Sequence, residues 1–145
     1  MEKSLKEYSM ADFRESFGLK RPDVREYSPL TLAYLGDAVY EIVIRTIIVE
    51  KANAPVNRLH KRSSALVKAQ TQADIIKKIE AVLTEEEKTV YKRGRNAHSK
   101  TMAKNATMID YRMATGFEAL IVYLYLKENF DRIVSLVKQG IEDLI

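Results

Sequence analysis

Two isolated acidic residues are the side chains in this sequence best suited to bind a cation. Asp37 stands within the apolar residues 34–40, and Glu118 is the only acidic residue between Asp110 and Glu128. A carboxylate among apolar neighbours is costly unless a cation compensates it. Because oxygen ligands suit Mg²⁺ or Mn²⁺, the two acids predict a metal site where their segments meet in the core.

A structural ion pair is the competing interpretation of Asp37. Glu41 follows Asp37 by four residues, so both acids lie on one face if the segment is helical. Arg45 or Arg112 could neutralise Asp37 in place of a metal ion. Structural pairs are the more common arrangement for such acids, and spacing alone leaves both interpretations open.

Basic residues without acidic neighbours form the second kind of candidate site. Residues 51–73 and 88–109 contain no acid. Their basic and amide side chains predict contacts with phosphate groups, most of all Arg58, Lys61, Arg62, Arg93, Arg95, Asn96, Lys100 and Lys104. Because aromatic residues are nearly absent around residues 93–104, a duplex backbone fits better than a single strand. For Lys88 and Lys92, the alternative is that they complement the negative end of a helix dipole.

The remaining composition excludes several classes of site. Cysteine is absent, which rules out disulfides and thiolate metal sites, and His60 and His98 lack partners at zinc-ligand spacing. No glycine-rich phosphate loop or Ser/His/Asp arrangement can be assembled. The 145 residues are 46% hydrophobic and 30% charged, with a net charge of +4, which is ordinary for one globular domain. We find no signal sequence and no apolar run of about 20 residues, so we expect a cytoplasmic protein with no membrane contact.

Helical signals dominate the elements that would position these residues. Ser28-Pro29 is a typical helix start and predicts a helix over residues 29–51, which is apolar on nearly every face and therefore central. A strand over residues 42–49 is the competing interpretation, but the helical pattern runs through it without a turn. Further helices are predicted over residues 55–82 with a break near 70–74, from the capping box at Thr84 to Arg95, from Thr107 through Leu124, and from residues 129–131 to Leu144, with a loop over 96–106. The sequence therefore predicts an all-α bundle, with core tyrosines at Tyr34, Tyr40, Tyr111, Tyr123 and Tyr125.

Two motifs resemble the signature helices of the ribonuclease III catalytic domain. They are Leu35-Gly36-Asp37-Ala38-Val39 and, later in the chain, Phe117-Glu118-Ala119-Leu120-Ile121. The resemblance extends from Tyr27 to Leu144, and we expect no second, double-stranded-RNA-binding domain of the kind ribonuclease III normally carries. With residues 93–97 and 104–106 before the second motif, the sequence is similar to the short bacterial branch of the family, Mini-ribonuclease III. The expected organisation is one catalytic domain over residues 27–145, preceded by an N-terminal extension over residues 1–26 with a short helix.

The resemblance also implies an activity and partners. It implies a homodimeric endoribonuclease that uses Mg²⁺, with Mn²⁺ as a substitute, to hydrolyse double-stranded RNA to 5′-phosphate and 3′-hydroxyl products. Asp37 and Glu118 would be the catalytic residues and the metal ligands. The implied process is maturation of the 23S ribosomal RNA precursor in ribosome biogenesis, and a ribosomal protein is a further candidate partner.

Two positions depart from the family pattern. The first motif usually has a glutamate four residues before its aspartate, where this chain has Ala33, and the second has an aspartate three residues before its glutamate, where this chain has Thr115. The short branch shares both replacements. Thr115 could still hold a water through its hydroxyl, and Glu41 could support the metal ligands from outside. The alternative function is a non-catalytic double-stranded-RNA-binding module that retains the fold.

Overall fold

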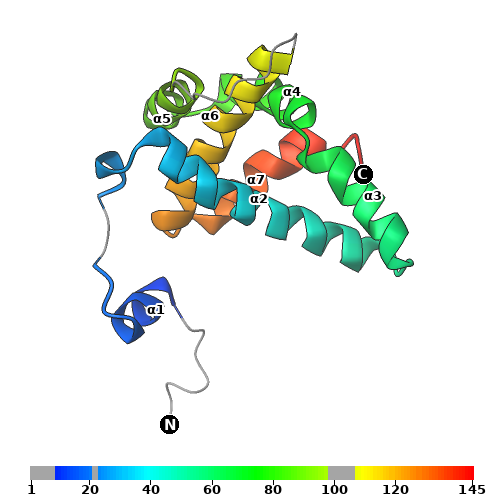
Figure 1. The fold of residues 1–145 in the computed structure, drawn as a ribbon, viewed down its shortest axis with the longest axis horizontal. Coiled ribbons are helices and arrows are strands. Elements are labelled where there is room, and N and C mark those ends of the chain that lie inside the picture. The colour runs from blue at the N-terminus through cyan, green and yellow to red at the C-terminus, as the bar shows by residue number, and fades with distance from the viewer. Residues whose placement is uncertain (1–8, 21–22, 98–106) are drawn as a thin grey trace.

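The protein is built entirely from helices in the part of the chain that the structure describes. The computed structural model describes residues 9–20, 23–97 and 107–145. In these ranges the structure has no strand, so the all-α prediction is confirmed (Figure 1). Residues 42–49, for which a strand was the competing interpretation, lie in helix α2. None of the described helices is both long enough and apolar enough to span a membrane.

Helices α2 (Pro29–Lys51) and α6 (Thr107–Leu126) form the centre of the core. The Ser28 hydroxyl accepts a hydrogen bond from the backbone N–H of Thr31 at the start of α2, as the sequence predicts. Tyr40 of α2 and Phe117 of α6 are fully buried, with their rings edge to face and the centroids 5.2 Å apart. The two motif-bearing helices therefore pack directly on each other.

The helix predicted over residues 55–82 is divided in two by the structure. Helices α3 (Val56–Val67) and α4 (Ala69–Ile79) meet at Lys68, whose extended backbone ends the helical pattern slightly before the predicted break. A 3-10 turn, η3 (Glu80–Val82), follows α4. Helix α4 packs against α6 and α7 and buries its isoleucines, Ile75, Ile76 and Ile79.

Helix α5 (Glu85–Arg95) begins at the predicted capping box. Thr84 Oγ1 accepts from the Glu87 backbone N–H at 3.1 Å, and Glu87 Oε1 accepts from the Thr84 backbone N–H at 2.9 Å. Arg132 of α7 (Phe130–Ile141) donates to both carboxylate oxygens of Glu87 at 2.9 Å. One buried carboxylate therefore caps α5 and joins it to α7.

The two ends of the chain are held differently. Helix α1 (Met10–Ser16) lies apart from the bundle in Figure 1 and is tied to it by Arg14, which donates to the last carbonyl oxygen of α6 at 3.0 Å. A 3-10 turn, η2 (Val24–Glu26), then leads into α2. The final helix ends at Ile141 rather than at the predicted Leu144, because the Leu144 backbone N–H closes a turn on the Ile141 carbonyl oxygen at 2.7 Å.

Helix α2 is central, as predicted, but part of its apolar surface is not covered by any other element of the described residues. Tyr34 is 84% exposed and Ile42 is 64% exposed, and Val49 is exposed as well. An apolar sequence shows that a helix can be buried, but not which of its faces another element covers. Of the five tyrosines expected in the core, Tyr40 and Tyr123 are buried there, Tyr125 is partly buried, and Tyr34 and Tyr111 are exposed.

Candidate active site

A glycine brings α2 and α6 into backbone contact beside the two acids. A Cβ atom added to Gly36 would overlap the carbonyl oxygen of Glu118 and lie 2.6 Å from its carbonyl carbon. Only glycine permits this approach, because any larger residue would separate the helices. Since Asp37 follows Gly36 directly, the contact places both acids at one helix crossing.

The two carboxylates act on each other electrostatically at this crossing. Glu118 is partly buried, and burial is the main cause that raises the pKa of its carboxyl to about 8. The negative charge of Asp37 and a hydrogen bond with its side chain raise this pKa further. The structure therefore brings together the two acids that the sequence singled out.

Asp37 differs from the expectation in one respect. The sequence predicted that it points into the core, but its side chain is exposed, on the uncovered side of α2. Arg45, one of the two arginines considered as an ion-pair partner for Asp37, binds Glu41 through its Nη2 atom at 2.6 Å. The carboxylate of Asp37 is thus open to a ligand from solvent while Glu118 lies behind it.

Gln72 is a third polar group at the crossing, and sequence reasoning missed it. It lies in the first turn of α4, is 2% exposed, and donates from Nε2 to Glu118 Oε2 at 3.3 Å. A signal was present in the sequence, because Gln72 occupies the same helical stripe as Ile75, Ile76 and Ile79. A lone amide in an apolar stripe predicts a buried polar contact, but not with which helix.

The donors at the crossing fit a magnesium ion better than a metal that needs a full protein cage. No group of three or more His, Cys, Asp or Glu side chains in the described residues could hold a metal ion. Mg²⁺ commonly takes one or two carboxylates from a protein and keeps several waters. Two adjacent carboxylates, one of them facing solvent, match that pattern, and a bound cation would also relieve their repulsion.

The two residues predicted to support the acids already have other contacts. Thr115 is buried, and its hydroxyl donates to the Tyr111 carbonyl oxygen of its own helix at 3.0 Å, so the hydroxyl can accept but not donate a further hydrogen bond. Glu41 is held by Arg45, as described above. Their proposed roles beside the metal ligands stay predictions.

The predicted phosphate-binding residues fall in two places. Arg58, Lys61 and Arg62 are exposed on α3, and Arg93, Arg95 and Asn96 lie at the end of α5. Figure 1 shows α3 and α5 towards opposite ends of the long axis, on either side of the α2–α6 crossing. The Arg95 guanidinium lies 5.7 Å from the centroid of the Tyr91 ring and donates from Nε to Asn96 Oδ1 at 3.2 Å. Lys100 and Lys104 lie outside the described residues.

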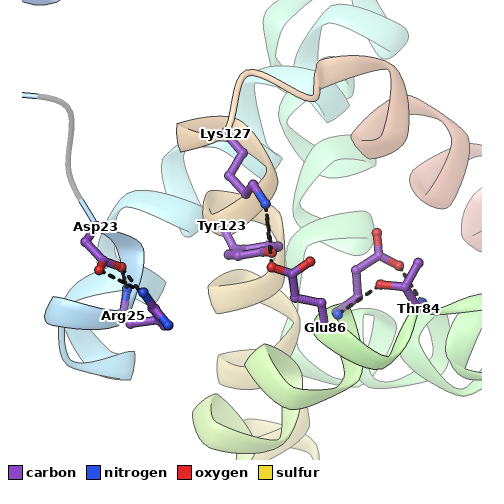
Figure 2. Close-up of polar contacts among 7 residues, drawn as sticks. Asp23, Arg25, Thr84, Glu86, Tyr123 and Lys127 are labelled. Carbon is purple, nitrogen blue, oxygen red and sulfur yellow. Dashed lines mark hydrogen bonds and ion pairs between the residues drawn. The ribbon is translucent and has the colours of Figure 1, made fainter.

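A second polar cluster lies farther along α6 (Figure 2). Tyr123 is buried, its hydroxyl accepts from Lys127 Nζ at 3.2 Å, and Lys127 also pairs with Glu86 at 3.6 Å. Burial raises the pKa of Tyr123, and the hydrogen bond with Glu86 raises it further. Because five residues turn a helix by roughly 140° net, Tyr123 and Glu118 face different sides of α6. This cluster therefore joins α5 to α6 and is separate from the two acids.

Known proteins are similar in sequence over the part of the chain that forms this site. The model of the ribonuclease III domain matches residues 30–129, which include both acids. The chain belongs to the ribonuclease III family. Within the family it falls in the Mini-ribonuclease 3 branch, as its sequence predicted, and it is an endoribonuclease of the ribonuclease III type.

Its relatives in the family cover most of the chain. The Mini-ribonuclease 3 of Clostridium tetani is 51% identical over 119 residues, which are 81% of this chain and 79% of the relative. That of a Thermoanaerobacter species is 46% identical over 137 residues, covering 94% and 96% of the two chains. A crystal structure of a Fusobacterium nucleatum protein superposes with a TM-score of 0.77 at 36% identity, covering 85% of this chain and 98% of the other.

Proposed function

We propose that the protein cleaves double-stranded RNA in a reaction that needs Mg²⁺, with Asp37 and Glu118 as the metal ligands. The observation that carries the proposal is the meeting of these two carboxylates at the Gly36 contact. A bound Mg²⁺ supplies Lewis-acid chemistry, because it activates a water and stabilises negative charge on phosphoryl oxygens. The exposed Asp37 gives the site access to a large substrate that could not enter a closed pocket.

The chain's own residues account for binding and orientation in this proposal. The α2–α6 contact fixes the backbone of Glu118, and Gln72 donates a hydrogen bond to its carboxylate. A water loses a proton as its oxygen attacks the phosphorus and the bond from phosphorus to the 3′ oxygen breaks. The 3′ oxygen takes up a proton from the solvent and leaves as a hydroxyl, while the 5′ side keeps the phosphate. The reaction needs no side-chain nucleophile.

Basic side chains on α3 and α5 would hold the duplex across the acids. Arg58, Lys61 and Arg62 on one side and Arg93 on the other are exposed. Such contacts with phosphate groups position an A-form duplex by its shape and carry little sequence information. We extend the proposal to the 23S ribosomal RNA precursor as the substrate and to the cytoplasm as the place of action, with a ribosomal protein as a candidate partner.

We also propose that the protein acts as a homodimer whose two sites cut opposite strands. The support is the exposed apolar surface of α2 and the groove of about 570 Å³ between α2 and α7, which includes Ile42 and Val134. An exposed apolar groove with polar residues at its rim is typical of a protein–protein contact. A second copy would cover it and supply the second site.

Cleavage of a long RNA duplex tests the proposed reaction. We expect scission with Mg²⁺ and none with a chelator, and we expect Asp37→Asn and Glu118→Gln each to lower the rate by about 100-fold or more, since each removes a metal ligand. The matched control is Glu50→Gln, an exposed acid on α2 outside the crossing. Scission that is independent of Mg²⁺, or equal in the two variants and the control, contradicts the proposal. Binding without cleavage by the unmodified protein would support the non-catalytic alternative.

A transcript of the 23S precursor tests the proposed substrate. We expect this transcript to be cut faster than an unrelated RNA duplex of equal length. Equal rates would contradict the substrate while leaving the reaction in place.

A further inference from the structure

The orientation of the Gln72 side chain is fixed by its two hydrogen bonds. Nε2 donates to the Val67 carbonyl oxygen at 2.8 Å and to Glu118 Oε2 at 3.3 Å. Both partners are acceptors, so the nitrogen of the amide must face them and Oε1 must lie on the other side. The hydrogen bond with Val67 thus identifies which end of the amide is Nε2 and which is Oε1.

The Oε1 atom of Gln72 is the unusual feature of this arrangement. It is buried and has no hydrogen-bond partner, the one such side-chain atom found among the described residues that are not exposed. Leaving a buried acceptor unpaired destabilises a protein, and buried polar atoms without partners commonly mark a place for a water or an ion. The same residue also provides the hydrogen bond from α4 to the Glu118 carboxylate.

Closing the α3–α4 junction does not by itself require Gln72. Thr71, its neighbour in the chain, is also buried and donates from Oγ1 to the Ala65 carbonyl oxygen at 2.6 Å across the same junction. An apolar side chain of equal volume at position 72 would avoid the unpaired oxygen. The chain nevertheless places an amide beside the carboxylate.

We propose that Gln72 is a positioning residue for metal binding. Its Nε2 group holds the Glu118 carboxylate in the orientation that it needs to share a Mg²⁺ ion with Asp37, and its Oε1 atom accepts a hydrogen bond from a buried water on the other side of the amide. Supporting groups of this kind orient metal ligands in many proteins, and their loss weakens metal binding. The inference rests on the proposed function, because it assumes that the two acids bind the ion.

Metal titration without RNA tests the inference independently of cleavage. Gln72→Met keeps the volume and removes the amide, and we expect its affinity for Mg²⁺ or Mn²⁺, measured by calorimetry on purified protein, to fall about 10-fold. Gln72→Leu also removes the amide, and we expect the same fall in affinity, because leucine cannot donate to the Glu118 carboxylate. Thr71→Val is the matched control, and we expect it to lower the melting temperature without changing metal affinity.

The outcomes separate this inference from the function on which it rests. Unchanged metal affinity in Gln72→Met would overturn the role of Gln72 while leaving the metal site in place. No binding by the unmodified protein would contradict the metal site itself. If Gln72→Met does not fold, Gln72→Leu decides: affinity reduced about 10-fold supports the inference, and unchanged affinity overturns it.

Discussion

Gly36 of α2 lies so close to the backbone carbonyl of Glu118 in α6 that no side chain fits between them. The contact joins the two signature motifs through their backbones and not through flexible side chains. The separation of the Asp37 and Glu118 backbones is therefore set by helix packing.

Gly36→Ala should destabilise the protein, although the same change inside an uncrowded helix stabilises by up to about 1 kcal/mol. The added methyl group must displace α2 from α6, and such overpacking typically costs about 1–3 kcal/mol. We expect a lower melting temperature and a lower cleavage rate. Ala38→Ser, an exposed change in the same turn, should leave both unchanged. An unchanged melting temperature in Gly36→Ala would show that α2 and α6 leave room for a methyl group between Gly36 and the Glu118 backbone.

The stability of the metal-free protein should fall as the pH rises towards about 8. Burial in the folded protein raises the pKa of Glu118 from its ordinary value of 4.5 to about 8, so the folded state binds its proton more tightly than the unfolded state does. The resulting stabilisation is complete below about pH 4.5 and is lost as the pH approaches about 8. In the presence of a chelator, the melting temperature of Glu118→Gln should be higher than that of the unmodified protein, and the difference should grow as the pH rises over this range. A difference in melting temperature that does not change with pH would contradict the raised pKa of Glu118.

Arg132→Met should destabilise the protein strongly at neutral pH, by about 3 kcal/mol, because it leaves a buried carboxylate without its cation. Glu87 is 4% exposed, and hydrogen bonds from Arg132 are the main cause that lowers its pKa. This stabilisation exists above the unfolded pKa of Glu87 and is lost as the pH falls, so the effect should shrink in acid. Denaturant unfolding at two pH values measures it. Lys77→Met, which breaks a long exposed pair with Asp74, should cost less than about 1 kcal/mol.

Lys61→Ala and Arg62→Ala should each weaken binding to an RNA duplex without changing the melting temperature. A lost phosphate contact lowers the slope of log affinity against log salt by about 1. Binding is measured at several salt concentrations in the Glu118→Gln background, so that the RNA stays intact. Lys77→Ala, at an exposed lysine on α4 outside the proposed interfaces, is the control. A salt slope that is unaffected by changes on α3 would remove this helix from the proposed interface.

Ile42→Glu should convert the proposed homodimer to a monomer, because it places a charge in the exposed apolar surface of α2. Sedimentation velocity measures the change in mass, and circular dichroism checks the fold. We expect the monomer to lose coordinated cutting of both strands. If the unmodified protein is itself monomeric, the dimer proposal fails.

Local chemistry explains which parts of the fold could be predicted from the sequence. The starts of α2 and α5 were correct because Ser28 and Thr84 cap these helices with contacts inside a few residues of chain. The exposed face of α2 and the outward position of Asp37 could not be derived, since both depend on which elements cover a helix. Gln72 was missed for the same reason, because its partner Glu118 is far away in the sequence.

The end of α5 meets α6 in the same manner as α2 does. A Cβ atom added to Gly94 would lie 2.8 Å from the Cα atom of Gly116, in the turn of α6 that contains Glu118. Arg93, next to Gly94, is therefore attached to the acidic site through a rigid backbone junction. If Arg93 binds a phosphate as proposed, the spacing of α5 and α6 would set the distance along the RNA from that phosphate to the cleaved bond.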